Sequence, residues 1–415
     1  MKDTSKKAVA LLWHRFGPYH HARLRAARRL FEVVGVQFSP VDPVYAWDAV
    51  KPGAGMLTLF EDRFSQEVPP DEVRARVAAA FGALRPMALA VPGWSDRAPL
   101  AALEWAKDHA VPALLMSPSQ RDDAPRTRLR EWVKGRLVRL FDAALVGGAP
   151  QARYLEDLGF PTERISAGYN AVDNAYFARG AARARSQAAL LRRRMRLPRD
   201  YFVVSARLVP KKNLENLFRA YRVYQMGMER LGVRAWKLLV LGDGVLRPRL
   251  ESLARERGLA GNVFLPGFKQ YGELPAYYGL ARALVLPSLS EQWGLAVNEA
   301  MASGLPVFVS HRCGCAEDLV QEGVNGRLLE PRDPAQMASV LRWATLAGAG
   351  AGKELSAMGQ AGHKIIAGHG PAGFGLGLKR SLELALNCPR RRLGALDRLL
   401  LRRVMLRTFK ESQDA

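Results

Sequence analysis

The segment PSLSEQWGLAVNEAMASGLPVF, residues 287–308, combines a turn with the start of a helix. Gly294 ends the turn, and LAVNEAMA after it has the spacing of a helix. The first backbone N–H groups of a helix, here near Leu295 and Ala296, have no partner within the helix and carry a partial positive charge. This segment therefore predicts a site for a phosphate group.

Two glutamates lie on either side of this predicted anion site. Glu291 precedes the turn, and Glu299 lies about one and a half turns into the helix. For an isolated pair, the simpler interpretation is a solvated loop acid and a helix acid. Carboxylates accept hydrogen bonds from sugar hydroxyl groups, however, and are poor partners for phosphate. The combination favours a ligand whose hydroxyl groups flank a phosphate, as in a nucleotide sugar.

Two cations follow another apolar run. SARLVPKKNLENLF, residues 205–218, comes after a predicted buried strand and places Arg207 and Lys212 five residues apart, in a loop that opens a helix. Two cations at the end of a strand suit a diphosphate. An isolated basic pair would more often only solvate the surface. Beside the glutamates and the helix start, the pair indicates one part of a larger site.

The elements that must position these residues alternate along the chain as short apolar runs and helix-length patterns, which is typical of βαβ units. Nine runs read as buried parallel strands: residues 8–13, 87–92, 113–117, 143–148, 201–208, 237–244, 262–268, 281–288 and 305–311. We therefore predict an α/β fold with two doubly wound Rossmann-like domains facing a cleft. Ligands of such folds bind at the carboxyl ends of the strands.

Composition supports two domains and sets their boundaries. A chain of 415 residues with 48% apolar and 24% charged residues is typical of soluble proteins, and it excludes long disorder and a disulfide scaffold. Residues 183–196 carry six arginines and no acid, as a solvated connector or an anion-facing helix would. The predicted parts are an N-terminal domain (1–180), a basic linker (181–199), a C-terminal domain (200–370) and a C-terminal region (371–415).

The net charge of +23 predicts a negatively charged neighbour. Residues 379–410 hold ten Lys or Arg against two acids, and leucines at helical intervals separate them. Such a basic amphipathic tail suits an anionic membrane surface. No apolar run is long enough to span a bilayer. The three cysteines do not form a Cys-x-x-Cys pair, which suggests reduced thiols. We expect a cytoplasmic protein, peripheral on the inner membrane face if the tail binds lipid.

The second half resembles the nucleotide-sugar-binding domain of retaining glycosyltransferases of family 4, which have the GT-B fold. Residues 207–212 match the family pattern Arg-Leu-Val-Pro-x-Lys, residues 241–244 match its LGDG turn, and Glu291 and Glu299 match its Glu-x7-Glu signature. The similarity covers nearly the whole chain, since residues 168–177 also resemble the end of the family's N-terminal domain.

The resemblance assigns roles to these residues. It implies that Arg207 and Lys212 bind the donor diphosphate, that Glu291 faces the transferred sugar and that Glu299 holds the ribose hydroxyl groups. It also implies that part of residues 379–387 is a crossover helix that docks on the first domain with a solvated basic face. We accordingly take Glu291, Arg207 and Lys212 as the catalytic group.

The sequence departs from the family pattern at several positions. Ala206 replaces the usual Gly before the Arg, and Asn213 replaces the common Gly after the Lys. The first loop, WHRFGPYHHARL, keeps only Gly17 of a frequent Gly pair, and we expect Gly17 to face the donor phosphate. His20 and His21 are candidates for the acceptor side, although a His at a helix start more often caps or packs the helix.

No Asp-x-Asp pair, the usual anchor for Mg²⁺ or Mn²⁺, occurs in the chain. We therefore expect no metal and no other cofactor.

The expected function is the retaining, metal-independent transfer of a sugar from a nucleoside-diphosphate sugar to an acceptor hydroxyl, with a glycan or lipid-linked acceptor of surface polysaccharide synthesis. The alternative is a non-catalytic basic protein that binds nucleotide or nucleic acid. Because the chain lacks the interleaving of aromatic and basic residues that single-stranded binders use, we expect no nucleic acid partner.

Overall fold

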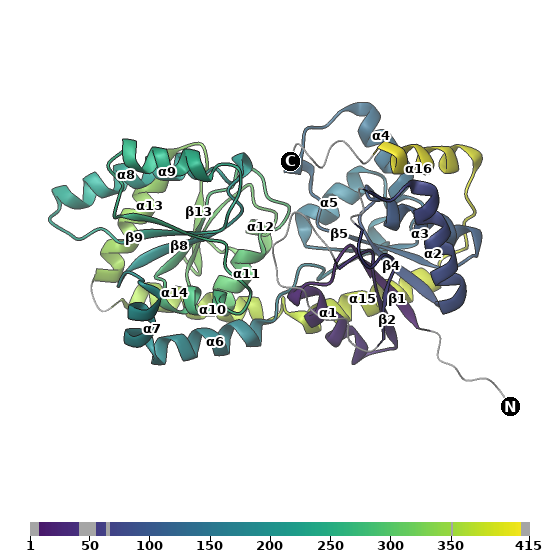
Figure 1. Ribbon diagram of the computed structural model, residues 1–415, viewed down its shortest axis with the longest axis horizontal. Coiled ribbons are helices and arrows are strands. Elements are labelled where there is room, and N and C mark those ends of the chain that lie inside the picture. The colour runs from purple at the N-terminus through teal and green to yellow at the C-terminus, as the bar shows by residue number, and fades with distance from the viewer. Residues whose placement is uncertain (1–7, 41–54, 64–66, 350–351, 408–415) are drawn as a thin grey trace. The chain divides into compact units, whose positions relative to one another are not determined.

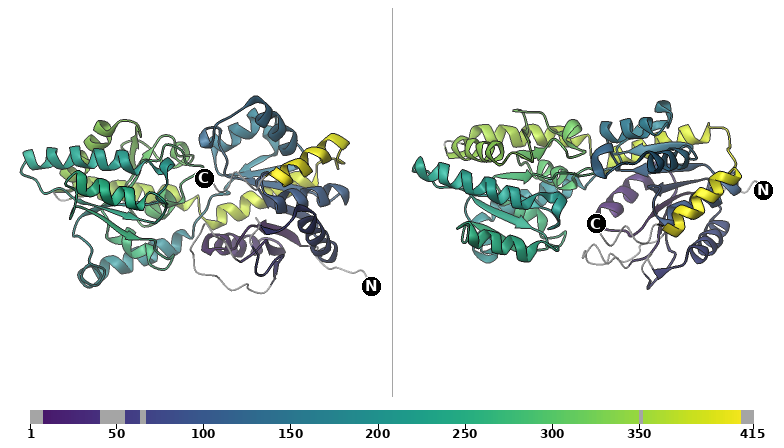
Figure 2. Two further views of the ribbon diagram at one scale, coloured as in Figure 1. Left: turned by 45° about the horizontal axis from the view of Figure 1, so that its top comes forward. Right: turned by 90° about the horizontal axis from the view of Figure 1, so that it is seen from above.

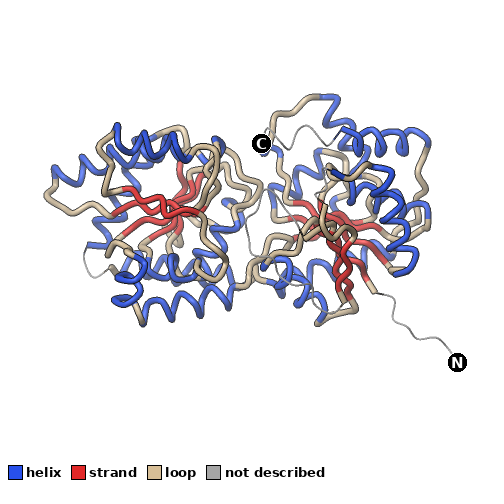
Figure 3. The backbone as a smooth tube through the Cα atoms, viewed as in Figure 1, coloured by secondary structure: helices blue, strands red, loops and turns tan. Residues whose placement is uncertain are grey.

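A computed structural model describes residues 8–40, 55–63, 67–349 and 352–407 of the chain. The chain divides into two compact units (Figure 1). The first unit contains residues 1–171 and 371–415, and the second contains residues 172–370. Each unit has a parallel sheet with helices on both faces (Figure 3). The predicted α/β fold with two doubly wound domains is confirmed.

The first unit is built on a parallel sheet with the order β3-β2-β1-β4-β5-β6-β7. Its strands are β1 (Val9–Trp13), β2 (Val33–Gln37), β3 (Met56–Thr58), β4 (Ala88–Pro92), β5 (Ala113–Ser117), β6 (Ala143–Val146) and β7 (Ile165–Ala167). The chain proceeds outward in one direction from β1 and then in the other from β4. The two strands are paired neighbours, so the order reverses between them.

Helices cover both faces of this sheet because its strands are apolar on both sides. Leu11 and Leu12 are consecutive in β1 and enter different core clusters, one on each face. The described helices of the first unit are α1 (Pro18–Arg28), α2 (Pro70–Leu84), α3 (Arg97–Asp108), α4 (Arg128–Val138), α5 (Ala149–Asp157), α15 (Pro371–Leu386) and α16 (Ala395–Arg407), with the short 3-10 helices η2 (Arg121–Asp123) and η3 (Thr162–Arg164).

The second unit has a parallel sheet with the order β10-β9-β8-β11-β12-β13, which reverses between β8 and β11. Its strands are β8 (Tyr201–Ser205), β9 (Lys237–Leu241), β10 (Val263–Gly267), β11 (Ala283–Leu286), β12 (Val307–Ser310) and β13 (Gly326–Leu329). Its helices are α6 (Asn174–Ser186), α7 (Ala188–Met195), η4 (Pro210–Lys212), α8 (Leu214–Arg230), α9 (Arg247–Glu256), α10 (Leu274–Leu280), α11 (Leu295–Ala302), α12 (Ala316–Leu319), α13 (Pro334–Ala349) and α14 (Lys353–Ala367).

Two of the predicted domain boundaries are wrong. The first unit ends at residue 171 and not at 180. Residues 181–199 are not a linker, because they lie in α6, in α7 and in the turn before β8, all within the second unit. Helix α6 packs against α10 and α11, and Gly180 allows the close approach of Pro275. The arginine-rich composition of this segment therefore reflects the exposed faces of two docked helices.

The C-terminal region returns to the first unit, which agrees with the expected docking of a crossover helix. Helix α15 packs on α1, β6 and β7 through Phe374 and Leu378, and Gly377 allows its backbone to approach Ala167 closely. After Pro389 the chain is irregular until α16, which packs on α3, α4 and α2 (Figure 2).

The predicted basic tail, residues 379–410, is therefore only in part a free amphipathic helix. Leu401 and Met405 of α16 are buried in the core of the first unit, and Asp397 of α16 accepts a 2.6 Å contact from Arg136 of α4. Residues 408–410 of the predicted tail lie outside the described residues. Among the described helices, none has the length and apolar character needed to cross a bilayer.

Candidate functional site

The predicted donor residues other than Gly17 lie in the second unit, and several of them gather where its strand order reverses. Arg207 and Lys212 follow β8, and Glu291 follows β11, which is paired with β8 in the sheet. Ligands of doubly wound sheets bind at this point, outside the carboxyl ends of the strands. The structure thus brings together two segments that are about 80 residues apart in the sequence.

Lys212 ends the short helix η4, and Asn213 after it has a positive φ of 59°. Asparagine tolerates this left-handed conformation better than most residues, so it takes the place of the family's glycine. Its buried side chain also donates hydrogen bonds to the carbonyl oxygens of Pro287 (3.1 Å) and Pro331 (2.6 Å). Asn213 thereby ties the lysine turn to the segments that follow β11 and β13.

The LGDG turn supports the loop that carries Arg207. Gly242 and Gly244 have φ values of 135° and 153°, and a Cβ at Gly242 would lie 1.9 Å from the carbonyl oxygen of Ala206. The backbone of Leu208 donates to Asp243 O (2.8 Å) and accepts from Leu246 N (2.9 Å). These glycines let the LGDG turn pack its backbone against the backbone of the Arg207 loop. The turn therefore holds that loop in place.

Lys212 and Glu291 form an ion pair, and their side chains are 11% and 17% exposed. Burial, with smaller contributions from the charges of Lys211 and Arg207, lowers the pKa of Lys212 to about 8, while neighbouring Cys313 opposes the shift. The carbonyl of Glu291 accepts the N–H of Gly314 (3.0 Å), which fixes the backbone of the glutamate. Burial therefore makes the Lys212 ammonium lose its proton more easily than an exposed lysine does. A nearby anion favours the charged form of the side chain.

The predicted helix start is α11, whose N-cap is Gly294 with a φ of 106°. Leu295 and Ala296 are partly exposed in the first turn of α11, where backbone N–H groups have no acceptor within the helix. A Cβ on Gly294 would lie 3.1 Å from a Leu286 methyl, so glycine also meets a space requirement here. The helix dipole and these N–H groups suit one phosphate group.

Glu299 is 3% exposed, and its Oε2 accepts a hydrogen bond from the phenol of Tyr278 in α10 (2.6 Å). Trp293 is fixed in a similar way, because its Nε1 donates to Oδ1 of Asn298 (2.8 Å). The sequence motifs do not indicate Tyr278, Trp293 or Asn298 as site residues. Nothing in the local pattern around Tyr278 marks it, whereas the proximity of Trp293 and Asn298 to the Glu-x7-Glu signature was a usable signal.

Gly17, His20 and His21 lie in the first unit, after β1. Gly17 is the N-cap of α1 with an extended backbone, and its N–H donates to Nδ1 of His20 (3.1 Å). His20 packs on Trp13, and burial lowers its pKa well below the usual value. His21 packs against Phe16, with burial again lowering its pKa. His20 therefore caps the N-terminus of α1.

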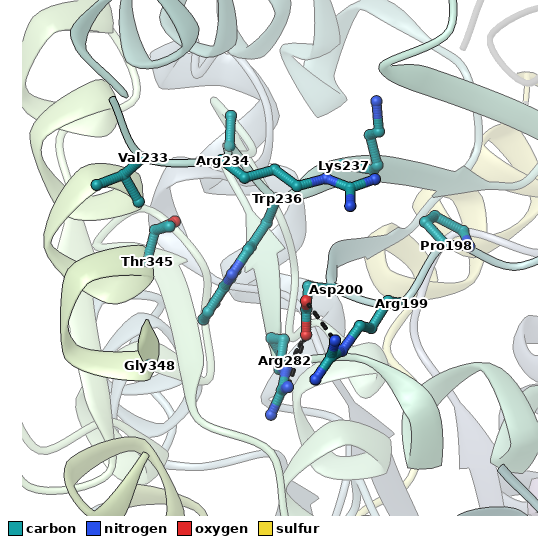
Figure 4. A pocket seen from close by; sticks show the side chains of 11 residues that line it. Pro198, Arg199, Asp200, Val233, Arg234, Trp236, Lys237, Arg282, Thr345 and Gly348 are labelled. Atoms are coloured by element: carbon teal, nitrogen blue, oxygen red, sulfur yellow. Dashed lines mark hydrogen bonds and ion pairs between the residues drawn. The ribbon is translucent and has the colours of Figure 1, made fainter. Parts of the chain in front are cut away.

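A pocket of about 330 Å³ lies elsewhere on the second unit, at the amino ends of its strands (Figure 4). Arg282 and Asp200, which form a 2.6 Å ion pair, lie beside the residues that begin β11 and β8. Ligands of this fold bind at the other ends of the strands. We therefore do not assign the donor to this pocket.

Most of the second unit resembles known proteins in sequence. Residues 192–364 match the model of the family described as glycosyl transferases group 1. The chain is 35% identical over 131 residues to an uncharacterized glycosyltransferase of Methanocaldococcus jannaschii, which covers 29% of this chain and 33% of that protein. It is 28% identical over 302 residues to a D-inositol 3-phosphate glycosyltransferase of Acidothermus cellulolyticus, covering 66% of this chain and 65% of that protein.

Among solved structures, the Anabaena protein HepE in complex with UDP superposes with a TM-score of 0.67 at 15% identity, over 91% of this chain and 99% of that one. At this identity the likeness shows the shared two-domain fold of GT-B glycosyltransferases. The chain spans between about a third and just under two thirds of the length of the two curated relatives above.

Proposed function

We propose that this chain is a glycosyltransferase that takes its sugar from a nucleoside-diphosphate sugar bound to the second unit. The observation that carries the proposal is the constellation at the β8/β11 reversal. Lys212, Arg207 and the start of α11 supply positive charge, and Glu291 and Glu299 supply hydroxyl acceptors. The family match over residues 192–364 and the UDP complex of HepE support a nucleotide-sugar donor.

The chemistry follows from the charge that develops as the donor bond breaks. Electrons pass to the leaving diphosphate, and stabilising that charge lowers the barrier. Lys212 pairs with Glu291, so a bound diphosphate competes for the ammonium group. Glu299, aligned by Tyr278, holds the ribose hydroxyl groups, and Glu291 lies toward the transferred sugar.

Retention of anomeric configuration and independence from metals are the finer parts of the proposal. They rest on the resemblance of the Glu-x7-Glu pair, Glu291 and Glu299, to retaining enzymes and on the two cations that serve the diphosphate. Activity is expected to survive EDTA, because Arg207 and Lys212 neutralise the leaving group. Complete loss in EDTA with recovery in Mn²⁺ would overturn the metal-free mechanism.

The acceptor hydroxyl is proposed to belong to a glycan or lipid-linked glycan of surface polysaccharide synthesis, reached from the cytoplasmic side of the membrane. The basic exposed surface of α16 supports a peripheral location. A curated relative acts, by its name, on D-inositol 3-phosphate, so this small phosphorylated polyol is a useful first acceptor to test. The alternative of a nucleic-acid-binding protein gains no support from the matches.

The function is tested with purified full-length protein and a panel of nucleoside diphosphates and their sugars. A true donor raises the melting temperature, since a ligand at a hundred times its Kd stabilises by about 2.7 kcal/mol. Hydrolysis of the same donor should be slowed by Lys212→Ala and unchanged by Lys211→Ala, which removes the neighbouring exposed lysine. If no nucleotide sugar stabilises the protein or is turned over, the proposal fails.

A further inference from the structure

The pocket of Figure 4, which we call the amino-end pocket, lies where three neighbouring strands of the second unit begin. Asp200 immediately precedes β8, Lys237 begins β9, and Arg282 immediately precedes β11. The strands are adjacent in the order β9-β8-β11, and parallel neighbours begin at the same edge of a sheet. The N–H of Lys237 donates to the carbonyl of Asp200 (3.0 Å). The N–H of Arg282 donates to the carbonyl of Tyr201 (2.9 Å), so backbone hydrogen bonds tie the three segments together.

Positive charge dominates the amino-end pocket. The described residues that line it include four cations and a single acid: Arg199, Arg234, Lys237, Arg282 and Asp200. Asp200 Oδ1 lies 2.6 Å from Nη2 of Arg282, and its Oδ2 lies 3.9 Å from Nε of Arg199. Two guanidinium groups therefore share one carboxylate, and the lining keeps a net charge of +3.

Arg234 is the guanidinium that has no acidic partner here. Its side chain is exposed between α8 and β9, and among the described residues no hydrogen bond or ion pair engages it. In Figure 4 its guanidinium lies apart from those of Arg199 and Arg282, which lie beside Asp200. Burial lowers the pKa of Lys237, and the positive charge of Arg234 lowers that pKa further. An anion bound between Arg234 and the other guanidinium groups would offset this repulsion.

The protein core fixes the wall of the amino-end pocket. Trp236 is 6% exposed, and its N–H donates to the phenol of Tyr224 (2.7 Å), which also bonds to Thr345 of α13 (2.7 Å). Gly348 of α13 leaves room for the indole, because a Cβ there would lie 2.5 Å from it. The guanidinium of Arg282 lies over this ring, 5.9 Å from its centroid. The volume of about 330 Å³ is near the lower end of the usual range for small-molecule sites.

We propose that the amino-end pocket binds a soluble phosphate monoester of a small hydroxylated molecule. The planar guanidinium groups of Arg199, Arg234 and Arg282 match phosphate oxygens in pairs, and the negative charge of the ester offsets their excess charge. The Asp200 carboxylate accepts hydrogen bonds from hydroxyl groups and repels a second phosphate, which favours a monoester. The pocket lies at the opposite ends of the strands from Lys212, so the inference is independent of the proposed transferase function.

Calorimetric titration of the full-length protein with sn-glycerol 3-phosphate tests the proposal, and glycerol is the matched probe without a phosphate. The lining variant is Arg234→Gln, which breaks no hydrogen bond or ion pair of the described residues. The control variant is Arg230→Gln, which removes an exposed arginine at the end of α8 and changes the net charge equally. Lys212→Ala determines whether the probe binds at the donor site instead.

The wild type and Arg230→Gln are expected to bind glycerol 3-phosphate with the same Kd, and neither should bind glycerol. Arg234→Gln should raise the Kd about tenfold, the effect of one lost hydrogen bond to a charged group. Lys212→Ala should leave the Kd unchanged, and thermal unfolding of each variant confirms that it is folded. An equal Kd in Arg234→Gln and Arg230→Gln, a loss of binding in Lys212→Ala, or no binding by the wild type would overturn the proposal. The titration uses no sugar donor, so a failure of the proposed transferase function would not change its outcome.

Discussion

At the scale of single residues, the buried ammonium of Lys212 gives the donor site a pH dependence. Burial lowers its pKa to about 8, below the ordinary lysine value of 10.5. The cation is therefore lost as pH rises through about 8, and kcat/KM for the donor should fall over the same range. Because the folded protein binds fewer protons than the unfolded chain between pH 8 and 10.5, the contribution of Lys212 to stability rises with pH there.

The matched variant is Lys212→Arg, since a guanidinium keeps its charge throughout this range. Its kcat/KM should be lower at pH 7, because the geometry changes, but it should not decline between pH 7 and 9. A decline identical to that of the wild type would assign the pH dependence to another group.

Tyr278 and Glu299 give a second prediction at this scale. Glu299→Ala should weaken donor binding by about 1.5 to 3 kcal/mol, the value of hydrogen bonds to a charged acceptor. Tyr278→Phe should weaken it less, by about 0.5 to 1.5 kcal/mol, because the carboxylate remains but loses the phenol that aligns it.

Tyr221→Phe is the control for this pair, since it removes a buried phenol that bonds to the carbonyl of Trp236 in the core. All three variants are measured by calorimetric titration with the nucleoside diphosphate and by thermal unfolding. Tyr221→Phe should lower only the melting temperature. Unchanged affinity in Glu299→Ala would refute the ribose assignment.

At the scale of elements, the LGDG turn positions a loop and need not touch the ligand. Gly242→Ala should destabilise the protein by about 1 to 3 kcal/mol, because its Cβ would collide with the Ala206 carbonyl, and it should raise the KM for the donor. Gly258→Ala, at a φ of 65° with open space around it, should show only the backbone strain of about 1 kcal/mol. Chemical denaturation and donor kinetics test both; an unchanged KM in Gly242→Ala would separate the turn from the site.

The elements were predictable to the degree that local patterns determine them. The nine apolar runs, such as residues 113–117, became strands because a strand buried on both faces is apolar throughout. Strands β3 and β7 were missed, since three residues are too short for a pattern. Strand β2 (VVGVQ) contains a glycine, and β13 (GRLL) begins with one, which weakened their signals.

The site was predictable in the same way. Motif residues such as Glu291 and Lys212 were found from their spacing, and the structure confirms that they meet. Tyr278 was missed, because tertiary packing decides its contact with Glu299, which lies 21 residues away in the chain. Residues 181–199 were wrongly predicted to be a linker, since high charge alone does not distinguish an exposed helix face from a linker.

At the scale of the whole molecule, the proposed membrane contact must be carried by the exposed face of α16, because its other face is buried. Leu396, Leu399 and Leu406 are 44%, 53% and 66% exposed. Exposed Leu129 and Trp132 lie on α4, which packs against α16. Leucines among arginines suit an anionic leaflet.

The double variant Leu399→Glu with Leu406→Glu should therefore reduce sedimentation with anionic liposomes and leave thermal stability unchanged. The control places glutamate at Leu190 and Leu231, which are exposed on the second unit. A truncation at residue 387 is a poor test, because it also removes Leu401 and Met405 from the core. Equal binding by the two double variants and the wild type would exclude this face from membrane contact.

The return of residues 371–415 to the first unit has a consequence for synthesis on the ribosome. At about 5 to 20 residues per second, the intervening 172–370 take roughly 10 to 40 s to emerge, and during that time α1, β6 and β7 lack their covering helix α15. The second unit is continuous in sequence and has no such delay. The nascent first unit thus exposes an apolar sheet face that chaperones can bind until the segment translated after the second unit covers it.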